Sequence, residues 1–556
     1  MSLWFSAVMV LIATAIPAAT AAPANAANGE VQIDLTDVLG HDMPGRVDLR
    51  GAGKDPVVLE IPQGHLQTNV PAGDYKSYIY AYVLGVPVLV DVKNAKIKSG
   101  ATEFILVNLL EGSGQRPLFD FDKDCDFALD RVETAEGTNP ADASSIPGKP
   151  ALPFENKVLD DEEKWYRGEL HCQSTYGGGK ETVAELVSRA EKLGLDFLAI
   201  TDRNTLAASQ DTAFKSKSVA LIPAMEWGSN ERGVALLYGP RTFPEFVDSV
   251  PQAQALVDLV QAQGGFFAVA HPCFPGKPWQ WGLAYVNGIE VWCRDWGSVP
   301  PLSLDELSED LGERKEGKLV HSVAYAAASA MVHGQPNQLS ANGQACVFYD
   351  AELVRGLRAA AIGGSGSASP SVPLASPVTY VYAPDKSVNG ILDGLRRGRT
   401  YVSSGLKGPR LHFSADILSD KKTDVGIGGT VPIGVPTTFE VAVDGAEGQE
   451  IQILLNGRPL ISKTIEGNGF IIQFEDTPAT YAVYRARVIG RPKEMRFGNL
   501  ELYAMTSPIY AQDVEIDDPK IKEAKDQTKK KLMAPTPEIQ LPASPGPGEI
   551  KPKWKF

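Results

Sequence analysis

The chain has 556 residues, of which 43% are hydrophobic and 22% charged, and its formal net charge at pH 7 is −15. This length is too great for one hydrophobic core, so we expect several domains. The acidic balance argues against a nucleic-acid or anionic-membrane partner, because phosphate binding needs a basic patch. Metals, sugars and small organic substrates remain open.

The N-terminal segment has the features of a secretory signal peptide. An uncharged apolar run, LWFSAVMVLIATAI (3–16), is followed by small residues and by Ala24-Asn25-Ala26, an A-x-A-type cleavage site. We therefore predict a signal peptide over 1–26 and a secreted or periplasmic mature chain. No Lys or Arg precedes the apolar run, so a retained membrane anchor is the alternative. No later segment is long and apolar enough to span a bilayer.

Period-two alternation between turn residues indicates a small β-sandwich over residues 27–137. Its clearest strands are VQIDLTDV, PVVLEIP, GDYKSYIYAYV, VPVLVDV and EFILVNLL. A Pro-, Ser- and Asn-rich stretch, TNPADASSIPGKPALP, follows and predicts a linker over 138–159.

The pattern then changes to helices alternating with strands over residues 160–409. This alternation predicts parallel βα units, arranged as a barrel or a doubly wound sheet. The predicted helices are 182–195, 252–263 and 387–398, and strands are predicted at 196–201, 360–365 and 378–383. From 410 to 514 short strands return and predict a second β-sandwich. Residues 515–556 are charged and then Pro-rich, which predicts a disordered tail.

Polar residues fall at the C-terminal ends of the predicted strands in the βα region. In βα barrels that end carries the active site. The residues are His171, Asp202, Arg203, Glu226, His271 and Glu290. Such a set could ligate a divalent cation such as Zn, Mn or Fe. The alternative for any one strand-end histidine is a hydrogen-bonded core residue.

Five motifs in this region resemble a known superfamily. LHCQST, AITDRNT, PAMEW, AVAHP and IGGSGSASP are similar to the strand-end motifs of the polymerase-and-histidinol-phosphatase (PHP) metal-dependent phosphoesterases. GILDGLRRGRTYVSSG, followed by a β-rich region containing LLNGRPL, resembles the CehA/McbA branch of metallohydrolases, whose named members cleave a carbamate ester. The resemblance covers roughly 160–500. It implies a distorted (β/α)7 PHP-type barrel, flanked here by the two β-sandwiches, with up to three metals that activate a water for attack on a phosphate or ester.

Carried over by position, the implied metal ligands are incomplete. His171 matches the first histidine of the opening motif, but its partner is Gln173. Asp202 is present, whereas Arg203 stands where the family has a histidine. Glu226 matches the metal-bridging glutamate.

The later motifs show the same loss. His271 matches the Ala-His-Pro histidine, but RGVALL (232–237) lacks an expected histidine. Gly366 and Ala368 stand where an Asp- or Asn-x-His pair is usual. The chain would therefore hold fewer Zn, Mn or Fe ions than the family's full set, or none.

Two interpretations follow from these residues. In the first, the chain is a hydrolase of a small-molecule ester, phosphoester or carbamate. Glu226, His271 and His171 would hold the metal, and Asp202 would be a ligand or a supporting carboxylate. In the second, the chain is a non-catalytic descendant that binds a ligand such as a glycan.

Arg203 joins Glu226 and Asp202 as a candidate catalytic residue. Its guanidinium could pair with either carboxylate, replace the charge of a lost metal, and hold a phosphate or carboxylate bidentately. The alternative is that Arg203 points into solvent.

Three further features have less specific patterns. Five tryptophans follow or lie within the strand-end segments. They either line the mouth of the barrel and stack on a sugar or aryl ring, or pack loops onto the barrel. They are Trp227, Trp279, Trp281, Trp292 and Trp296. DFDKDCDFALDR (120–131) alternates acids like a calcium loop, but Cys125 stands at its sixth position and Arg131 at its twelfth, which favours a solvated acidic turn. The five cysteines form no CxxC pair, and their odd number leaves at least one free thiol or an unpredictable pairing.

Overall fold

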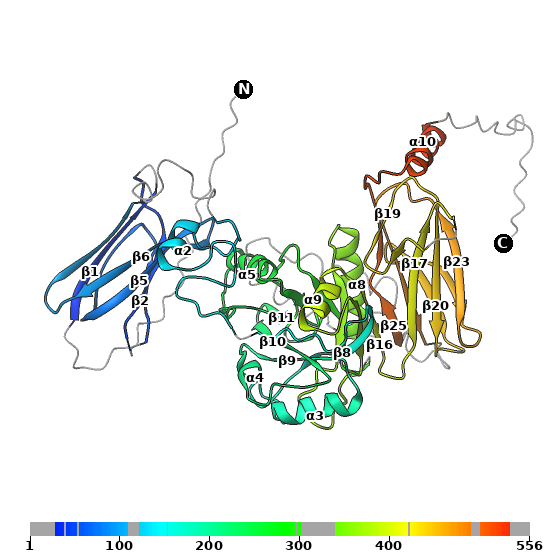
Figure 1. Ribbon diagram of the computed structural model, residues 1–556, viewed down its shortest axis with the longest axis horizontal. Coiled ribbons are helices and arrows are strands. Elements are labelled where there is room, and N and C mark those ends of the chain that lie inside the picture. Colours follow the sequence, from blue (N-terminus) through cyan, green and yellow to red (C-terminus); the bar gives the residue numbers. More distant parts are fainter. Residues whose placement is uncertain are drawn as a thin grey trace, which may run out of the picture. The chain divides into compact units, whose positions relative to one another are not determined.

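The computed structural model describes residues 28–37, 40–52, 55–108, 122–152, 154–295, 297–301, 340–420, 423–490 and 501–533. The predicted signal peptide, 1–26, lies outside these ranges. The fold is mixed α/β, with many strands and few helices (Figure 1). It divides into two compact units. Unit 1 is Met1–Ala141 with Ile146–Gly148, and unit 2 is Asp142–Ser145 with Lys149–Phe556.

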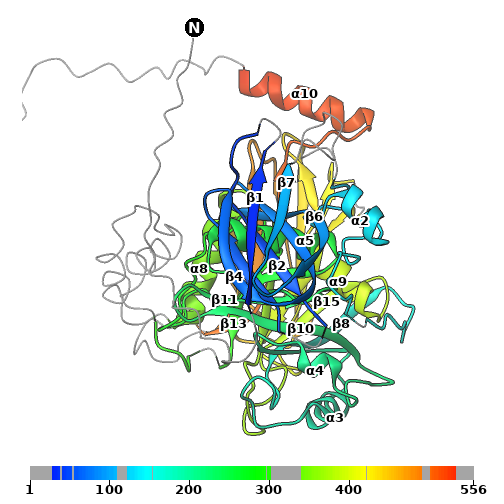
Figure 2. The ribbon, with the colours of Figure 1, turned by 90° about the vertical axis from the view of Figure 1, so that its left-hand side faces the viewer.

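Unit 1 contains two sheets and a short helix. The elements are β1 (Asn28–Thr36), β2 (Gly45–Arg50), β3 (Val57–Ile61), β4 (His65–Pro71), β5 (Gly73–Val83), β6 (Val86–Ile97), β7 (Thr102–Asn108) and α2 (Asp130–Glu136). One sheet has the order β4-β1-β7 and the other β3-β2-β5-β6 (Figure 2). Along β1 the alternate residues Val31, Ile33 and Leu35 are fully buried, which is the period-two pattern expected of a half-buried strand.

The first part of unit 2 follows the helix–strand alternation of the sequence. Its strands are β8 (Lys164–Cys172), β9 (Phe197–Arg203), β10 (Ala220–Ser229), β11 (Gly233–Tyr238), β12 (Phe266–Val269), β13 (Gly288–Cys293), β14 (Ala360–Gly364), β15 (Val378–Ala383) and β16 (Thr400–Ser403). Its helices are α3 (Val183–Leu193), α4 (Ala207–Gln210), α5 (Val250–Ala262), α8 (Ala341–Val354) and α9 (Val388–Arg396). Thr182 caps α3 with a capping box to Glu185.

The strand directions are mixed, so the expectation of parallel βα units is correct for only part of the sheet. β8, β9 and β10 run parallel, as do β12, β13 and β14. β11 is antiparallel to both β10 and β12, and β15 is antiparallel to β8. The cause for β11 is local. Ser229 pairs with Gly233, so the connection from β10 to β11 is a tight turn, which is too short for a crossover helix.

The sheet curls so that β14 returns to the neighbourhood of β8. Cys172 and Ser367 form an isolated parallel bridge. The buried carboxylate of Glu169 accepts N–H hydrogen bonds from Ser365 at 3.0 Å and from Ala375 at 2.6 Å. A Cβ on Gly364 would lie 2.4 Å from Cβ of His171, so this close approach needs glycine. The curl places the C-terminal ends of β8, β10 and β13 around one interior.

The C-terminal part of unit 2 is built from short strands, as its sequence predicts. They are β17 (Arg410–Ile417), β18 (Val425–Gly426), β19 (Thr430–Pro432), β20 (Thr437–Asp444), β21 (Glu450–Leu455), β22 (Arg458–Thr464), β23 (Phe470–Asp476), β24 (Ala482–Ile489), β25 (Leu502–Thr506) and β26 (Ile509–Gln512). β18-β17-β20-β23 form a separate sheet. β25-β24-β21-β22 continue the main sheet, because β25 pairs with β16.

The chain beyond β26 differs from the expectation of a disordered tail at 515–556. Residues Pro519–Met533 form helix α10, and Ile521 is buried against the C-terminal core. Ala524 of the same helix and Ile516 before it also pack against this core, but so few apolar residues are difficult to detect in so charged a segment. Residues 534–556 lie outside the described ranges. Among the helices that the structure describes, none has both the length and the apolar character needed to cross a membrane.

Candidate metal centre

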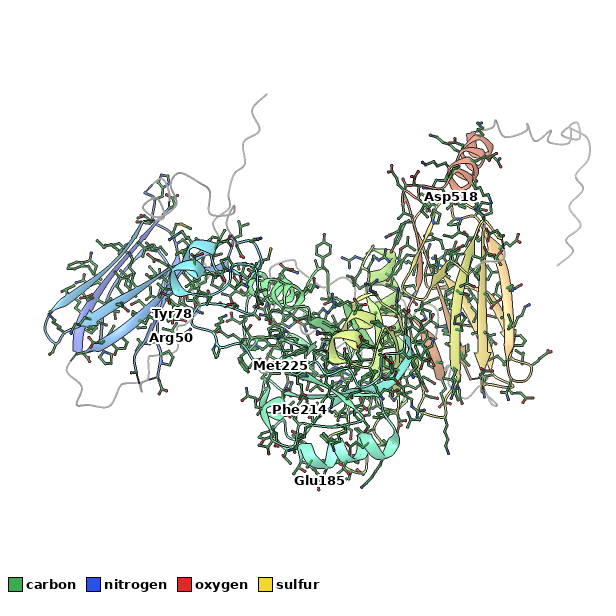
Figure 3. The ribbon with its side chains drawn as sticks, viewed as in Figure 1. Arg50, Tyr78, Glu185, Phe214, Met225 and Asp518 are labelled. Carbon is green, nitrogen blue, oxygen red and sulfur yellow. The ribbon has the colours of Figure 1, made fainter. Side chains whose placement is uncertain are left out.

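Three of the strand-end residues that the sequence singled out lie together. His171 is near the end of β8, Glu226 is near the end of β10, and His271 follows β12 (Figure 3 labels Met225, the neighbour of Glu226). One potential ligand atom from each lies within 4.8 Å of the others, and all three residues are buried. The strand ends therefore bring two imidazoles and one carboxylate to a common point.

Glu290 on β13 orients both histidines. Its Oε1 lies 2.8 Å from Nδ1 of His171, and its Oε2 accepts the backbone N–H of His271 at 3.0 Å. The two imidazole rings stack with their centroids 5.7 Å apart. Burial lowers the pKa of His171, but the negative charge of Glu290 and the interactions with Cys293 outweigh it and raise this pKa well above its usual value. A carboxylate behind a histidine is the usual support of a metal ligand.

His271 has an unusual backbone and an unpaired ring nitrogen. Its φ is 25°, a region that residues other than glycine seldom adopt. Its buried Nδ1 has no hydrogen-bond partner among the described residues. Burial lowers the pKa of His271, which favours the neutral imidazole. A neutral, unpaired imidazole nitrogen is the form that binds a metal.

Glu226 receives hydrogen bonds from two residues that are not part of the expected ligand set. Nε2 of Gln173 donates to Oε2 at 2.8 Å, and Nζ of Lys277 donates to Oε1 at 3.3 Å. Nε2 of His271 lies 3.6 Å from the same Oε1. Burial alone would raise the pKa of Glu226, but His271, His171 and Lys277 lower it well below its usual value. Glu226 is therefore ionised.

Sequence reasoning missed Lys277. It lies in the loop after His271 and not at a strand end, so the only signal was its short separation from His271. Sequence reasoning also assigned no function to Cys293, which forms a second candidate ligand group with His171 and Glu290. The Sγ atom of Cys293 lies 4.0 Å from Nδ1 of His171.

Asp202 lies at the end of β9 but stabilises a loop. Its carboxylate accepts the backbone N–H and the hydroxyl of Ser174, both at 2.6 Å. A Cβ on Gly177 would lie 2.4 Å from Oδ1 of Asp202, so the loop is closely packed around this group. Burial raises the pKa of Asp202, and the hydrogen bonds from Ser174 oppose that shift. Asp202 does not belong to the cluster of potential metal ligands that His171, Glu226 and His271 form.

Arg203 does not form the ion pairs expected of it. Its guanidinium donates to Oδ1 of Asn230 at 2.5 Å. No ion pair between Arg203 and Glu226 or Asp202 occurs in the described chain. Arg203 is partly exposed, and Lys277 is the cation beside Glu226.

The final strand end leaves no room for a ligand at Gly366. Its φ is 55°, and a Cβ there would lie 3.0 Å from both Sγ of Cys293 and Cγ of Arg294. The carbonyl of Ala368 accepts the N–H of Lys180 at 2.9 Å. This loop is therefore shaped by packing and backbone contacts.

The tryptophans pack the core. Trp227, Trp279, Trp281 and Trp292 are all buried in one hydrophobic cluster. The rings of Trp227 and Trp281 lie 5.2 Å apart. The packing alternative is therefore correct for these four, and Trp296 lies outside the described residues.

Comparisons with known proteins found resemblance only among solved structures. No family model matches the chain, and no curated protein does. It is similar to a two-domain protein from Bacteroides vulgatus that contains a predicted PHP-like metal-dependent phosphoesterase. The two sequences are 13% identical, the match covers 64% of this chain and 99% of that chain, and the TM-score is 0.31. It is also similar to a candidate metal-dependent phosphoesterase from Bifidobacterium adolescentis, with 14% identity, coverage of 37% and 89%, and a TM-score of 0.21.

Proposed function

We propose that the chain is a metal-dependent hydrolase of a small-molecule ester, phosphoester or carbamate, built on a PHP-type (β/α)7 barrel of the CehA/McbA kind between two β-sandwiches. The observation that carries the proposal is the convergence of His171, Glu226 and His271, with Glu290 hydrogen-bonded to both histidines. Two histidines and one glutamate are the protein ligands of many catalytic zinc sites. The ligand set fits one ion better than the family's full number.

When bound, a divalent cation such as Zn, Mn or Fe supplies Lewis acidity and an activated water. The residues of the chain have separate roles. Glu290 fixes the orientation of the His171 imidazole and holds the backbone at His271, and Gln173 fixes the carboxylate of Glu226. Lys277 offers a positive charge to an anionic substrate oxygen. Because the cluster is buried, these electrostatic interactions are stronger than they would be in water.

A second candidate function rests on Lys277 and Gln173. Their donors lie at the two oxygens of Glu226, so the buried carboxylate has partners without a metal ion. A pocket of this kind would suit a non-catalytic module that binds an anionic small molecule or a glycan. In either case we propose that the protein is exported, on the basis of the apolar run at 3–16, and that its partner is not a nucleic acid.

The test combines metal analysis with an activity screen. Purified full-length protein is analysed for Zn, Mn and Fe, and assayed with a bis-aryl phosphodiester and an aryl ester. The same measurements are made on Glu226→Gln and His271→Ala. The control is Glu163→Gln, whose carboxylate is 54% exposed and lies just before the opposite end of β8.

We expect stoichiometric metal and measurable turnover in the wild type and the control, and loss of both in the two site variants. Turnover that is unchanged in Glu226→Gln would exclude the catalytic role of this cluster. Absence of bound metal and of turnover in the wild type would favour the non-catalytic module.

A further inference from the structure

An acidic loop in unit 1 precedes helix α2. Counted from Asp122, the loop DKDCDFALDRVE (122–133) places carboxylates at positions 1, 3, 5, 9 and 12. These are the side-chain ligand positions of the twelve-residue EF-hand calcium loop, whose twelfth residue is a glutamate. Counting from Asp120 instead puts Arg131 last and hides this match. The burial of Asp126, which is 3% exposed, differs from the solvated turn that this count favours.

The backbone of the loop has the required turn. The carboxylate of Asp122 accepts the N–H of Asp126 at 3.1 Å and the N–H of Phe127 at 2.9 Å. Phe127 occupies the sixth position with a φ of 66°. This is the position at which EF-hand loops use glycine for a sharp turn. The loop therefore adopts the left-handed conformation even though its sixth residue is phenylalanine.

The carboxylates converge, and several of their oxygens lack partners. Oxygens of Asp122, Asp124 and Asp126 lie within 4.8 Å of one another. Asp126 is 3% exposed and Glu133 is fully buried. Oδ2 of Asp126, both oxygens of Asp124 and both of Glu133 have no hydrogen-bond partner among the described residues. Burying ionised carboxylates in this way is strongly unfavourable unless a cation joins them.

The electrostatics of the loop agree with this geometry. Burial, followed by the charges of Asp124 and Glu133, raises the pKa of Asp126 to about 8. Burial, followed by the charge of Asp124, raises the pKa of Glu133 to about 7. Glu133 therefore lies close enough to the aspartates for their negative charges to raise its pKa, although it comes from the first turn of α2.

Strand β6 holds the loop in place. The N–H of Leu89 donates to the carbonyl of Phe127 at 2.8 Å, and the N–H of Leu129 donates to the carbonyl of Leu89 at 3.2 Å. The guanidinium of Arg131 donates to the carbonyl of Val90 at 2.7 Å. Ala128 lies between these contacts and is the seventh residue of the loop. In EF-hand loops the backbone carbonyl of the seventh residue is a calcium ligand.

We propose that residues 122–133 bind one Ca²⁺ ion through the carboxylates of Asp122, Asp124, Asp126 and Glu133 and the carbonyl of Ala128. All of the proposed ligand atoms are oxygens, as a hard cation requires. The site lies in unit 1, and the candidate metal centre lies in unit 2. The two can therefore be tested separately.

The test is calcium titration of the full chain after treatment with EDTA, followed by isothermal calorimetry and by thermal unfolding. The variants are Asp124→Asn and Glu133→Gln. The matched control is Asp74→Asn, which makes the same kind of change at a carboxylate that is 79% exposed in unit 1. Glu226→Gln is measured alongside, to separate this site from the metal centre.

We expect saturable calcium binding in the wild type, Asp74→Asn and Glu226→Gln, with a raised unfolding temperature. Binding should weaken by more than about tenfold in both loop variants, because each removes a direct ligand. Both variants should stay folded in EDTA, since each removes one of several mutually repelling charges. Absence of saturable binding below about 1 mM calcium would overturn the proposal, because that is the weak end of known sites. Unchanged affinity in both loop variants, or their unfolding in EDTA, would also overturn it.

Discussion

At the scale of single residues, Glu226 shows how a buried carboxylate can be stabilised by either of two kinds of cation. The ammonium of Lys277 lies 3.3 Å from Oε1, on the same carboxylate that a metal would use. Like charges repel, so Lys277 and a divalent ion compete for Glu226. The relative strength of the two interactions decides between the hydrolase and the non-catalytic module.

Replacing Lys277 should favour the metal. In Lys277→Met we expect zinc affinity to rise by at least about tenfold, because two charges a few ångströms apart at a partly buried site interact by several kcal/mol. Competition with a chromophoric chelator measures this affinity. Lys164→Met, at the opposite end of β8, should leave it unchanged. Equal or weaker zinc binding in Lys277→Met would show that the lysine does not compete.

None of the five cysteines, all of which lie in the described ranges, forms a disulfide, which settles the pairing that sequence left open. Cys172, Cys273, Cys293 and Cys346 are buried, whereas Cys125 is exposed. Burial raises the pKa of each of the four buried thiols, to about 12 for Cys346. A buried thiol with a raised pKa contains little thiolate and reacts slowly.

Thiol labelling should therefore separate Cys125 from the other four. In native protein at pH 8, an aromatic disulfide reagent should label Cys125 rapidly, and the rest should react only after denaturation. A Cys125→Ser variant should lose the rapid phase alone. Rapid labelling of several thiols in that variant would contradict the burial of the others.

At the scale of elements, helix α8 is tied to strand β24 by a buried ion pair. Asp350 accepts two hydrogen bonds from Arg485, from Nε to Oδ1 and from NH2 to Oδ2, both at 2.6 Å. The side chain of Arg485 is only 1% exposed. A paired guanidinium at such a site is tolerated, whereas an unpaired one is costly.

Removing the carboxylate should destabilise unit 2. We expect Asp350→Ala to lower the free energy of unfolding by about 3–5 kcal/mol, because it leaves a buried charge without its partner. Glu352→Ala, two residues further along α8, removes a carboxylate whose partner Arg355 is 62% exposed, and should cost no more than about 1 kcal/mol. Urea unfolding followed by circular dichroism measures both. Similar costs for the two variants would contradict the argument.

Most elements could be predicted from the sequence, because their signals are local. The bounds of β5 and β15 match the predicted GDYKSYIYAYV and VTYVYA, which alternate between turn residues. Candidate site residues at strand ends were found for the same reason. Lys277 and the orientation of Arg203 were not, because a loop's path depends on tertiary packing. The calcium-loop match depends on which aspartate is counted first, and the φ of Phe127 and the burial of Asp126, which only the structure gives, support counting from Asp122.

At the scale of the whole molecule, one sheet joins two regions that the sequence divides at residue 409. β16 pairs with β15 on one side and with β25 on the other. The hydroxyl of Ser507 also accepts the N–H of Ala361 at 2.8 Å, which links β14 to the loop after β25. The β16–β25 pairing and the Ser507–Ala361 hydrogen bond join residues more than a hundred positions apart in the chain, so no local pattern predicts them.

Truncation tests this continuity. A chain of residues 142–409 should fail to unfold cooperatively and should aggregate, because it exposes the edge of β16 and the apolar surface that the C-terminal strands cover. A chain of residues 142–533 should remain soluble with one main thermal transition, because it keeps the sheet intact. A soluble, cooperatively unfolding 142–409 chain would contradict the shared sheet.

The pairing of β16 with β25 also bears on how this protein can diversify. Gene rearrangements that add or exchange a module succeed where the chain passes from one compact unit to another, and the boundary between units 1 and 2 lies at residues 141–149. The junction at 409 is different, because a cut there severs a strand pair. We therefore expect related chains to gain or lose unit 1 freely, while the curled sheet and its C-terminal strands are inherited together.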